Sequence, residues 1–529
     1  MVRSKHCSRV GKLSLLAVSA ASATLLSLST PVLAQESTAA QVAPMSRAQV
    51  ESTIGREIQR LVDAQKRIEG QGKHVSVSAS LNTKGDVLTL NLSVEYLPKS
   101  YGAEIEDLLN ELATAAEDRL RDRSTVRAVQ FRIGGHDIYD YFPAERPPAR
   151  REGKSSQAPH TTAGTIVLGA GHGIYYHYKF KDWRAQRDAS NGITEDFITP
   201  SFTTELSTWL VARSSATTLF ARSQATTIHD PSKQEWWKLG ARYYLEATYP
   251  DNPEIWHSKP DDTTPLRERN EDINSRPLFA NFIGATTLIH VHTNAGEAGA
   301  TGARGFYHSG RTDDQKLADN MMCYMGELIH AKEGYEEYTV PKTANPRDNL
   351  GENSKATMPS VIIEAGFHTN ATDAAALQDP IFRTAAMKGV EKGYRLNGEG
   401  KSCELFKVPK IENSTGLQNV PIPVKVPYKG YPEFAVTATV EIVSCPAGWT
   451  CTGGTITYSE KTPSPLKYTF TCNVTSQMPA ATFGLRTTLK DIDDVKSKPA
   501  DHTVTCTPSA QKVVPGAPGT KPTFSIGAS

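Results

Sequence analysis

Three short segments carry residue types that can bind a metal ion or move a proton. Residues 169–173 (Gly-Ala-Gly-His-Gly) present His172, residues 290–295 contain His292, and Glu364 opens the third segment. Two imidazoles and a carboxylate at one place match a mononuclear zinc hydrolase, which uses about three protein ligands and leaves one position for water. Each segment alone is weak evidence, because a histidine after a strand is more often structural.

Each of these segments follows a continuous apolar run that is typical of a buried strand. The runs lie at residues 165–168, 287–289 and 360–363, and helical patterns separate them. The alternation over residues 162–400 predicts an α/β domain with a central, mostly parallel sheet flanked by helices. Such sheets place their active sites at the carboxyl ends of the strands, so the three segments should meet there.

Residues 165–394 resemble the zinc-dependent N-acetylmuramoyl-L-alanine amidases, the cell-wall amidases of the amidase-3 type. The resemblance implies an amidase/phosphorylase-hydrolase-like fold and zinc-dependent hydrolysis of the amide bond between N-acetylmuramic acid and L-alanine in peptidoglycan. The motifs that carry it are Ile166-Val167-Leu168 with Gly171-His172-Gly173, Leu219-Phe220-Ala221-Arg222, Arg276 with Ala280-Asn281, the segment from Ile289 to Ala295, Gly305-Phe306-Tyr307, and Pro359 to Phe367 with Asn370 and Asp373.

The resemblance also implies a role for each site residue. His172 and His292 would bind zinc, and Glu364 would be the catalytic carboxylate that takes and returns a proton. The family's third ligand is a glutamate just before or at the start of the first helix. We expect Glu195 in this role, with Glu205 as the competing candidate.

Three further observations bear on this ligand set. Thr199 and Pro200 resemble the N-cap and first residue of a helix, which predicts that Glu195 lies just outside the helix. His290 shares a strand face with His292 and is expected to support the site or to be a partly buried histidine. Gly169 replaces the family's usual acidic residue, which removes a possible partner for a ligand.

Two alternatives to a peptidoglycan amidase remain open at this point. One is a zinc amidohydrolase or peptidase that cleaves another amide, and the other is a catalytically dead peptidoglycan-binding protein. An insertion at about residues 223–265 carries several aromatic residues, among them Trp236 and Tyr243. These could stack on sugar rings, or the insertion could be a subdomain that packs on itself.

The N-terminus predicts export. Basic residues precede an apolar stretch, and Val32-Leu33-Ala34 fits a cleavage site, so residues 1–34 are expected to be a signal peptide. The mature chain would be periplasmic or secreted, with no membrane span after cleavage. The formal charge of +1 argues against nucleic-acid binding, which needs clustered Lys and Arg.

The 529-residue chain predicts several domains. Residues 45–142 have the pattern of a small αββαβ domain, and residues 143–161 read as a linker. Residues 404–510 predict a β-sandwich, followed by a flexible tail at 511–529. We expect these flanking domains to bind the cell wall or to dock protein regulators.

Six cysteines follow the signal peptide, an even number that suggests disulfides in an exported chain. Cys472 and Cys506 lie on inward faces of alternating strands, and Cys445 and Cys451 flank a short loop. These two pairs are predicted to form disulfides, which leaves Cys323 and Cys403 as the third pair.

Overall fold

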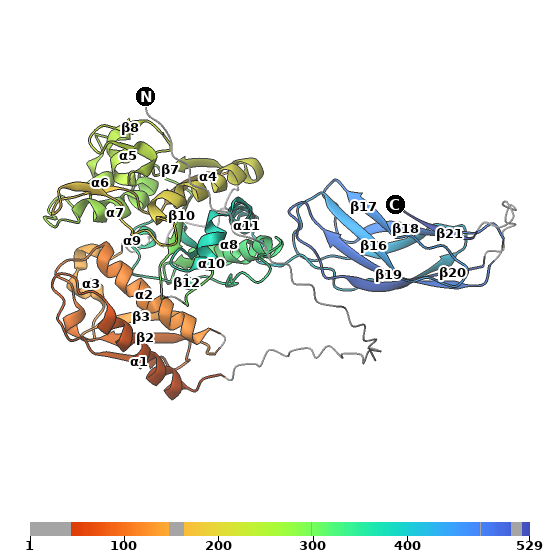
Figure 1. Ribbon diagram of the computed structural model, residues 1–529, viewed down its shortest axis with the longest axis horizontal. Coiled ribbons are helices and arrows are strands. Elements are labelled where there is room, and N and C mark those ends of the chain that lie inside the picture. Colours follow the sequence, from red (N-terminus) through yellow and green to blue (C-terminus); the bar gives the residue numbers. More distant parts are fainter. Residues whose placement is uncertain are drawn as a thin grey trace, which may run out of the picture. The chain divides into compact units, whose positions relative to one another are not determined.

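The computed structural model describes residues 44–121, 123–147, 163–297, 299–476, 478–508 and 521–528 (Figure 1). These residues belong to one compact unit. The predicted signal peptide lies outside them, as do most of the predicted linker and part of the predicted tail. No described helix is long and apolar enough to cross a membrane.

The N-terminal domain contains a three-stranded sheet and three α-helices. Its elements are α1 (Arg47–Ala64), β1 (Val77–Leu81), β2 (Val87–Leu92), α2 (Ala103–Leu120), β3 (Ala128–Ile133) and α3 (Ile138–Tyr141). Strands β1 and β2 form the predicted antiparallel hairpin, and β3 pairs parallel with β2. Helix α1 begins after Ser46, whose side chain forms a capping box with Gln49. The apolar residues of this domain form a hydrophobic core of their own.

The central domain is built on a six-stranded mixed sheet. Its strands are β4 (Thr165–Ala170), β7 (Thr217–Phe220), β10 (Thr287–Asn294), β11 (Arg304–Tyr307), β12 (Asn345–Pro346) and β13 (Ser360–Phe367), in the order β12-β11-β13-β10-β4-β7. β7, β4, β10 and β13 are parallel, whereas β11 is antiparallel to β13. The three apolar runs are therefore neighbouring strands, as the sequence predicts.

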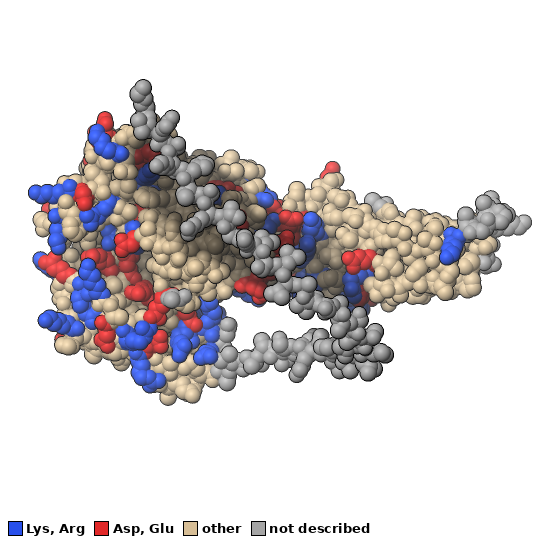
Figure 2. Space-filling model, in the orientation of Figure 1, with Lys and Arg blue, Asp and Glu red and all other residues tan. Residues whose placement is uncertain are grey.

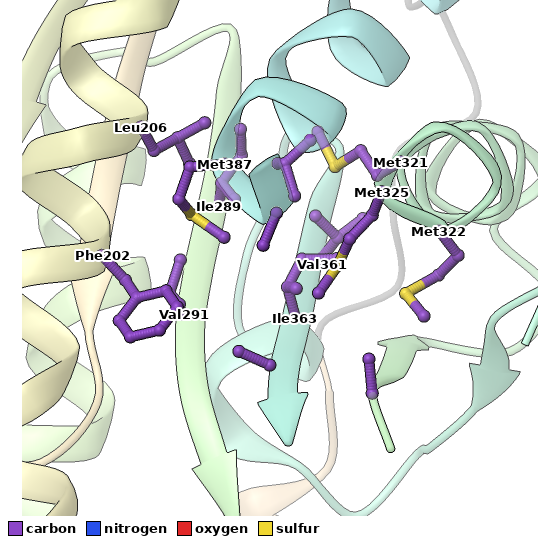
Figure 3. Packing of buried hydrophobic residues seen from close by; sticks show 14 of the residues in the cluster. Phe202, Leu206, Ile289, Val291, Met321, Met322, Met325, Val361, Ile363 and Met387 are labelled. Carbon is purple, nitrogen blue, oxygen red and sulfur yellow. The ribbon is translucent and has the colours of Figure 1, made fainter. Parts of the chain in front are cut away.

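Helices cover both faces of this sheet. One face packs against α4 (Glu195–Ser214), α8 (Thr312–His330), α10 (Ala371–Gln378) and α11 (Pro380–Gly398), and the other against α5 (Ala241–Thr248), α6 (Pro253–Trp256) and α7 (Arg267–Phe282). On the first face, Phe202, Met321 and Met387 pack against Ile289 and Val361 (Figure 3). Short elements occupy the connections: β5 (Tyr175–His177), β6 (Asp182–Arg184), β8 (Ile228–His229), β9 (Gln234–Glu235) and α9 (Gly351–Ser354).

The C-terminal β domain consists of two sheets. Their strands are β14 (Ser414–Leu417), β15 (Ile422–Val426), β16 (Val436–Ser444), β17 (Gly454–Tyr458), β18 (Leu466–Asn473), β19 (Ala481–Lys490), β20 (Ala500–Thr507) and β21 (Thr523–Ala528), in the orders β14-β20-β19-β16-β17 and β15-β18-β21. The visible face of this domain carries few charged side chains (Figure 2).

The disulfides and the end of the chain complete the C-terminal part. All three predicted cysteine pairs are formed, and Cys472–Cys506 joins the two sheets. The prediction of a flexible tail over residues 511–529 is wrong for β21, which pairs with β18. Phe524 explains the difference, because its ring stacks on Phe470 at 4.6 Å and extends the core.

Candidate active site

The carboxyl ends of three parallel strands bring the predicted chemical groups to one edge of the sheet. β10 lies between β4 and β13 and is parallel to both. His292 in β10 is the direct ladder neighbour of Glu364 in β13. His172 lies in the loop that follows β4. The strand order thus places these residues together, although they are far apart in the sequence.

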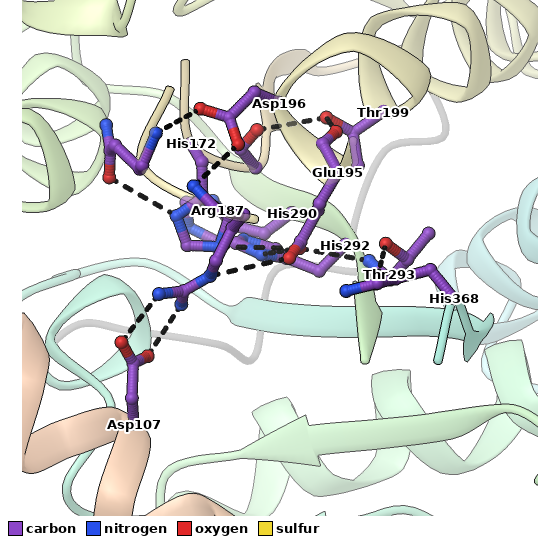
Figure 4. A network of polar contacts seen from close by, with 12 residues as sticks. Asp107, His172, Arg187, Glu195, Asp196, Thr199, His290, His292, Thr293 and His368 are labelled. Carbon is purple, nitrogen blue, oxygen red and sulfur yellow. Dashed lines mark hydrogen bonds and ion pairs between the residues drawn. The ribbon is translucent and has the colours of Figure 1, made fainter. Parts of the chain in front are cut away.

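His172, Glu195 and His292 form a compact group of metal-binding atoms (Figure 4). The Nε2 atom of His172 lies 3.3 Å from Oε1 of Glu195, and Nδ1 of His292 lies 3.0 Å from the same oxygen. One atom from each residue lies within 4.8 Å of the others, and all three residues are buried. Two nitrogens and one carboxylate oxygen are the donor types of a catalytic zinc site.

Glu195 is the first residue of α4, which corrects the predicted start of this helix. The sequence predicts a start at Thr199 and Pro200, but Pro200 lies inside the helix. Proline has no N–H to donate to the carbonyl of Asp196, four residues earlier. The buried guanidinium of Arg222 donates to that carbonyl instead, at 3.0 Å. A distant cation therefore makes an interior proline acceptable, which local sequence patterns do not reveal.

The loop after β4 aims His172 at the site through an unusual backbone. His172 has a φ of 58°, and Gly173 has a φ of 134°. A Cβ atom at Gly173 would lie 2.5 Å from the backbone nitrogen of Gly240, so only glycine fits there. The carboxylate of Asp196 accepts the backbone N–H groups of Gly173 and Gln186, at 2.9 and 2.7 Å, and fixes the loop.

Of the two competing candidates, Glu205 lies apart from the metal-binding group, whereas His290 lies beside it and forms a second possible metal-binding group with His292 and Glu352. The carboxylate of Glu205 accepts hydrogen bonds from Trp209 and Thr384. His290 is fully buried, and a Cβ atom at Gly169 would lie 2.3 Å from its Nδ1 atom. The glycine that replaces the family's acidic residue therefore makes room for this histidine.

The electrostatics of the group favour a positive charge between its carboxylates. Burial lowers the pKa of His292, but Glu352 and Glu195 outweigh this effect and raise the pKa to about 10. Burial also raises the pKa of Glu364 to about 8, an effect that Glu195 and Glu352 strengthen and His292 opposes. Among the described residues, the Oε2 atom of Glu364 has no hydrogen-bond partner. The site therefore suits a cation beside a carboxyl group that is free to exchange a proton.

The family model for N-acetylmuramoyl-L-alanine amidase matches residues 166–394, which include all four predicted site residues. The central domain belongs to this family. The sequence-based interpretation of the chain as a peptidoglycan amidase is thereby confirmed.

Three solved amidase structures are similar to part of the chain. They are CwlD from Clostridioides difficile in complex with the GerS lipoprotein (19% identity, 45% of this chain and 98% of that chain, TM-score 0.31), Ami1 from Mycobacterium smegmatis (14%, 46% and 100%, 0.31) and the catalytic domain of CwlV from Bacillus (Paenibacillus) polymyxa (15%, 45% and 99%, 0.29). No curated protein is similar enough to the chain to match. The family assignment rests on the family model.

Glu352 also lies in the candidate site, although the sequence analysis did not identify it. Its Oε2 atom lies 3.0 Å from Nε2 of His292, on the side of the ring opposite to Glu195. Arg276 forms an ion pair with Glu352. It forms a second ion pair with Asp272, at 2.7 Å. Arg276 belongs to a motif of the resemblance, but no spacing connects it to Glu352, because α9 is a single turn between two loops.

Arg187 and Asp107 were also missed. Arg187 lies in the loop between His172 and Glu195, whereas Asp107 belongs to α2 of the N-terminal domain. Both line a cavity of about 370 Å³ that also reaches Glu364. Arg187 stands beside the predicted ligands in the sequence, which was a usable signal. The sequence around Asp107 gives no such signal, because its partner Arg187 lies in another domain.

The aromatic insertion of the amidase domain packs beside the site rather than in it. Trp236 and Tyr243 pack with Tyr175 and Trp183 of the β5–β6 hairpin. Residues 223–265 are all described, and none of them lines the cavity. The insertion therefore packs against other parts of the amidase domain and not on itself alone.

Proposed function

We propose that the amidase domain holds a zinc ion through His172, Glu195 and His292 and that Glu364 transfers the proton in hydrolysis of the muramoyl–L-alanine amide. The observation that supports this proposal most strongly is that one donor atom from each of the three ligands lies within 4.8 Å of the others. Glu364 is paired with His292 on the adjacent strand. Zinc bound there would lower the pKa of a water molecule and polarise the amide carbonyl.

Glu364 fits the role of a general base and then a general acid. Its carboxyl group is nearly buried, lines the cavity and keeps one oxygen without a hydrogen-bond partner among the described residues. It takes a proton from the water that attacks the lactyl carbonyl carbon. As the carbon–nitrogen bond breaks, it gives this proton to the nitrogen of L-alanine, and the stem peptide leaves.

Glu352 positions His292 for metal binding. A carboxylate that accepts the Nε2–H of a histidine fixes the tautomer in which Nδ1 carries a lone pair. The Nδ1 atom of His292 is the one that faces Glu195 and His172. Arg276 holds Glu352 in place. We infer that the Arg276–Glu352 pair orients this ligand rather than contacting the substrate.

The flanking sequence supports an extracytoplasmic site of action. Three disulfides are formed, and disulfides persist in oxidising compartments. We propose that the chain is exported and acts on peptidoglycan in the periplasm or outside the cell. The flanking domains are then available to bind the wall or protein regulators.

The experiment that tests this function replaces Glu364 with Gln, which keeps the shape and removes the base. Hydrolysis of purified peptidoglycan should fall by ~10²–10⁴, while zinc content and thermal stability stay near wild type. His172→Ala is the contrast, because it should lose zinc and activity together. A near-normal rate for Glu364→Gln would refute the role of Glu364. Fragment analysis must show free muramoyl carboxylates, since another product would point to a different amide.

The role of Glu352 has its own test. Glu352→Gln should weaken zinc binding by roughly 10- to 100-fold in a competition with a chelator, as is usual for a residue that orients a metal ligand. Activity at saturating zinc should recover to a large extent. The control is Glu205→Gln, which removes a carboxylate from the same domain away from the site and should leave zinc affinity unchanged. Equal zinc affinity in both variants would contradict the positioning role.

A further inference from the structure

The N-terminal domain supplies one wall of the catalytic cavity. Four polar residues of α2 line this wall: Glu106, Asp107, Asn110 and Glu111. His172, Glu195 and Glu364 line the same cavity. A helix from a separate domain therefore borders the cavity that contains the proposed zinc site.

Arg187 connects this wall to the proposed metal ligands (Figure 4). Its Nη1 and Nη2 atoms bind the two oxygens of Asp107, each at 2.6 Å, in the forked geometry of an arginine–carboxylate pair. On its other edge, Nε lies 3.5 Å from Oε2 of Glu195. Arg269 also donates to Asp107, at 2.8 Å. The cavity thus contains an arginine next to the proposed ligands. A carboxylate from outside the amidase domain is paired with this arginine.

We propose that Arg187 is a binding site for a carboxylate of the peptide part of the substrate, and that Asp107 occupies this site as a built-in competitor. The N-terminal domain then keeps the enzyme closed until it is displaced. This inference rests on the proposed function, because it needs a substrate that carries a peptide carboxylate near the scissile amide. An arginine suits this ligand because its fork matches the two oxygens of a carboxylate.

The contacts that join the two domains are polar. Arg347 pairs with Glu117 through two hydrogen bonds of 2.6 Å. The hydroxyl groups of Tyr101 and Tyr139 donate to backbone carbonyls of the amidase domain, at 3.1 and 2.8 Å. The hydrophobic core of the N-terminal domain contains no residue of the amidase domain. Polar interfaces between domains permit relative movement, whereas a shared apolar core opposes it.

An engineered disulfide tests whether the N-terminal domain must move. A Cβ atom at Gly102, which precedes α2, would lie 2.7 Å from the side-chain carbon of Asn270 on α7. Gly102→Cys with Asn270→Cys should therefore lock the domains together in the zinc-loaded mature protein. The oxidised variant should release stem peptides from peptidoglycan on the order of tenfold more slowly or worse, and dithiothreitol should restore the rate.

Wild-type protein with and without dithiothreitol is the control, because it shows what reduction of the native disulfides does. An oxidised variant that works at the wild-type rate would overturn the proposal and make α2 a permanent wall of the substrate site. Absence of hydrolysis by the wild type itself would instead contradict the proposed function, so the two failures are distinguishable.

A binding measurement tests the competition between Asp107 and the substrate. The probe is a soluble muramoyl-L-alanyl-D-glutamate fragment, titrated by calorimetry into protein that also carries Glu364→Gln to prevent turnover. Asp107→Asn should tighten binding by about two- to fivefold, the range expected for a partly exposed ion pair. Arg187→Gln should weaken binding and should remove the gain from Asp107→Asn when the two are combined. Equal gains with and without Arg187 would refute the carboxylate site.

Discussion

The N-terminal and C-terminal domains both contact the amidase domain, but they do so by different means. The hydrophobic core of the C-terminal β domain includes Leu328 of α8, and the disulfide between Cys323 and Cys403 ties this helix to the segment that enters the β domain. The N-terminal domain shares neither a core residue nor a disulfide with the amidase domain among the described residues. The C-terminal domain is therefore joined to the amidase domain by a shared core and a disulfide, whereas the N-terminal domain contacts it without either.

Ion pairs alone do not make this difference, because both interfaces contain them. Asp493 of the β domain binds Arg213 and Lys388 and is 1% exposed. Burial raises its pKa, but these two cations outweigh burial and lower the pKa to about 2. Asp107 at the other interface is 36% exposed. The lesson is that charges strengthen an interface that apolar packing already fixes, whereas an interface of polar contacts without a shared apolar core can open.

The largest expected effect comes from the shared core. Leu328 is 1% exposed, and Leu328→Ala should cost about 2–5 kcal/mol, the usual range for a buried leucine. The transition of the amidase domain should shift together with that of the β domain in urea unfolding. The control is Leu90→Ala in the core of the N-terminal domain, which should shift only a separate transition of that domain. A loss of amidase-domain stability in Leu90→Ala would break the comparison.

Most of the framework of the candidate site could be predicted from the sequence, because local patterns encode it. Continuous apolar runs identified β4, β10 and β13, and the parallel topology then required His172, His292 and Glu364 to meet. Two of the cysteine pairs followed from strand faces and loop length, and the third followed by elimination. Periodicity and spacing are properties of single elements, so they are visible without the fold.

The features that escaped prediction depend on contacts between elements. The start of α4 at Glu195 needs Arg222, which satisfies a carbonyl that Pro200 leaves without a donor. Asp107 lies on a polar helix face, which ordinarily faces water, and only the docking of two domains brings it to Arg187. No local pattern distinguishes a solvated carboxylate from one that is paired across an interface.

A second prediction weakens the polar interface at its most buried pair. Arg347 is fully buried, and its partner Glu117 is 11% exposed. Arg347→Met should cost roughly 3–5 kcal/mol of docking free energy, because it leaves a carboxylate without its partner. Hydrogen exchange at α2 should then rise while the core strands of the amidase domain stay protected. The matched control is Arg486→Met, which breaks an exposed ion pair with Asp501 on the β domain. This variant should change neither the docking free energy nor hydrogen exchange at α2.

The smallest expected effect is a pH dependence of docking through Glu106. This residue is buried at the interface, where the backbone N–H of Gly351 donates to its carboxylate at 3.3 Å. Burial raises its pKa to about 7; Gly351 and Lys355 oppose this, while Asp107 and Glu352 add to it. The docked domain therefore favours the protonated acid, whereas an undocked Glu106 exposed to water returns toward the ordinary value of 4.5.

The sign of this effect follows from the raised pKa. The contribution of Glu106 to docking is fully present below about pH 4.5 and is lost as the pH rises through about 7. Docking should weaken by at most about tenfold per pH unit within that window, because a single proton is exchanged. Hydrogen exchange at α2, measured between pH 5 and 8 and corrected for the intrinsic exchange rate, reports docking independently of catalysis. Glu106→Gln should remove the pH dependence by keeping a neutral side chain of the same shape. If the variant retains the wild-type profile, another group controls docking, and the polar interface opens for a reason other than this carboxyl group.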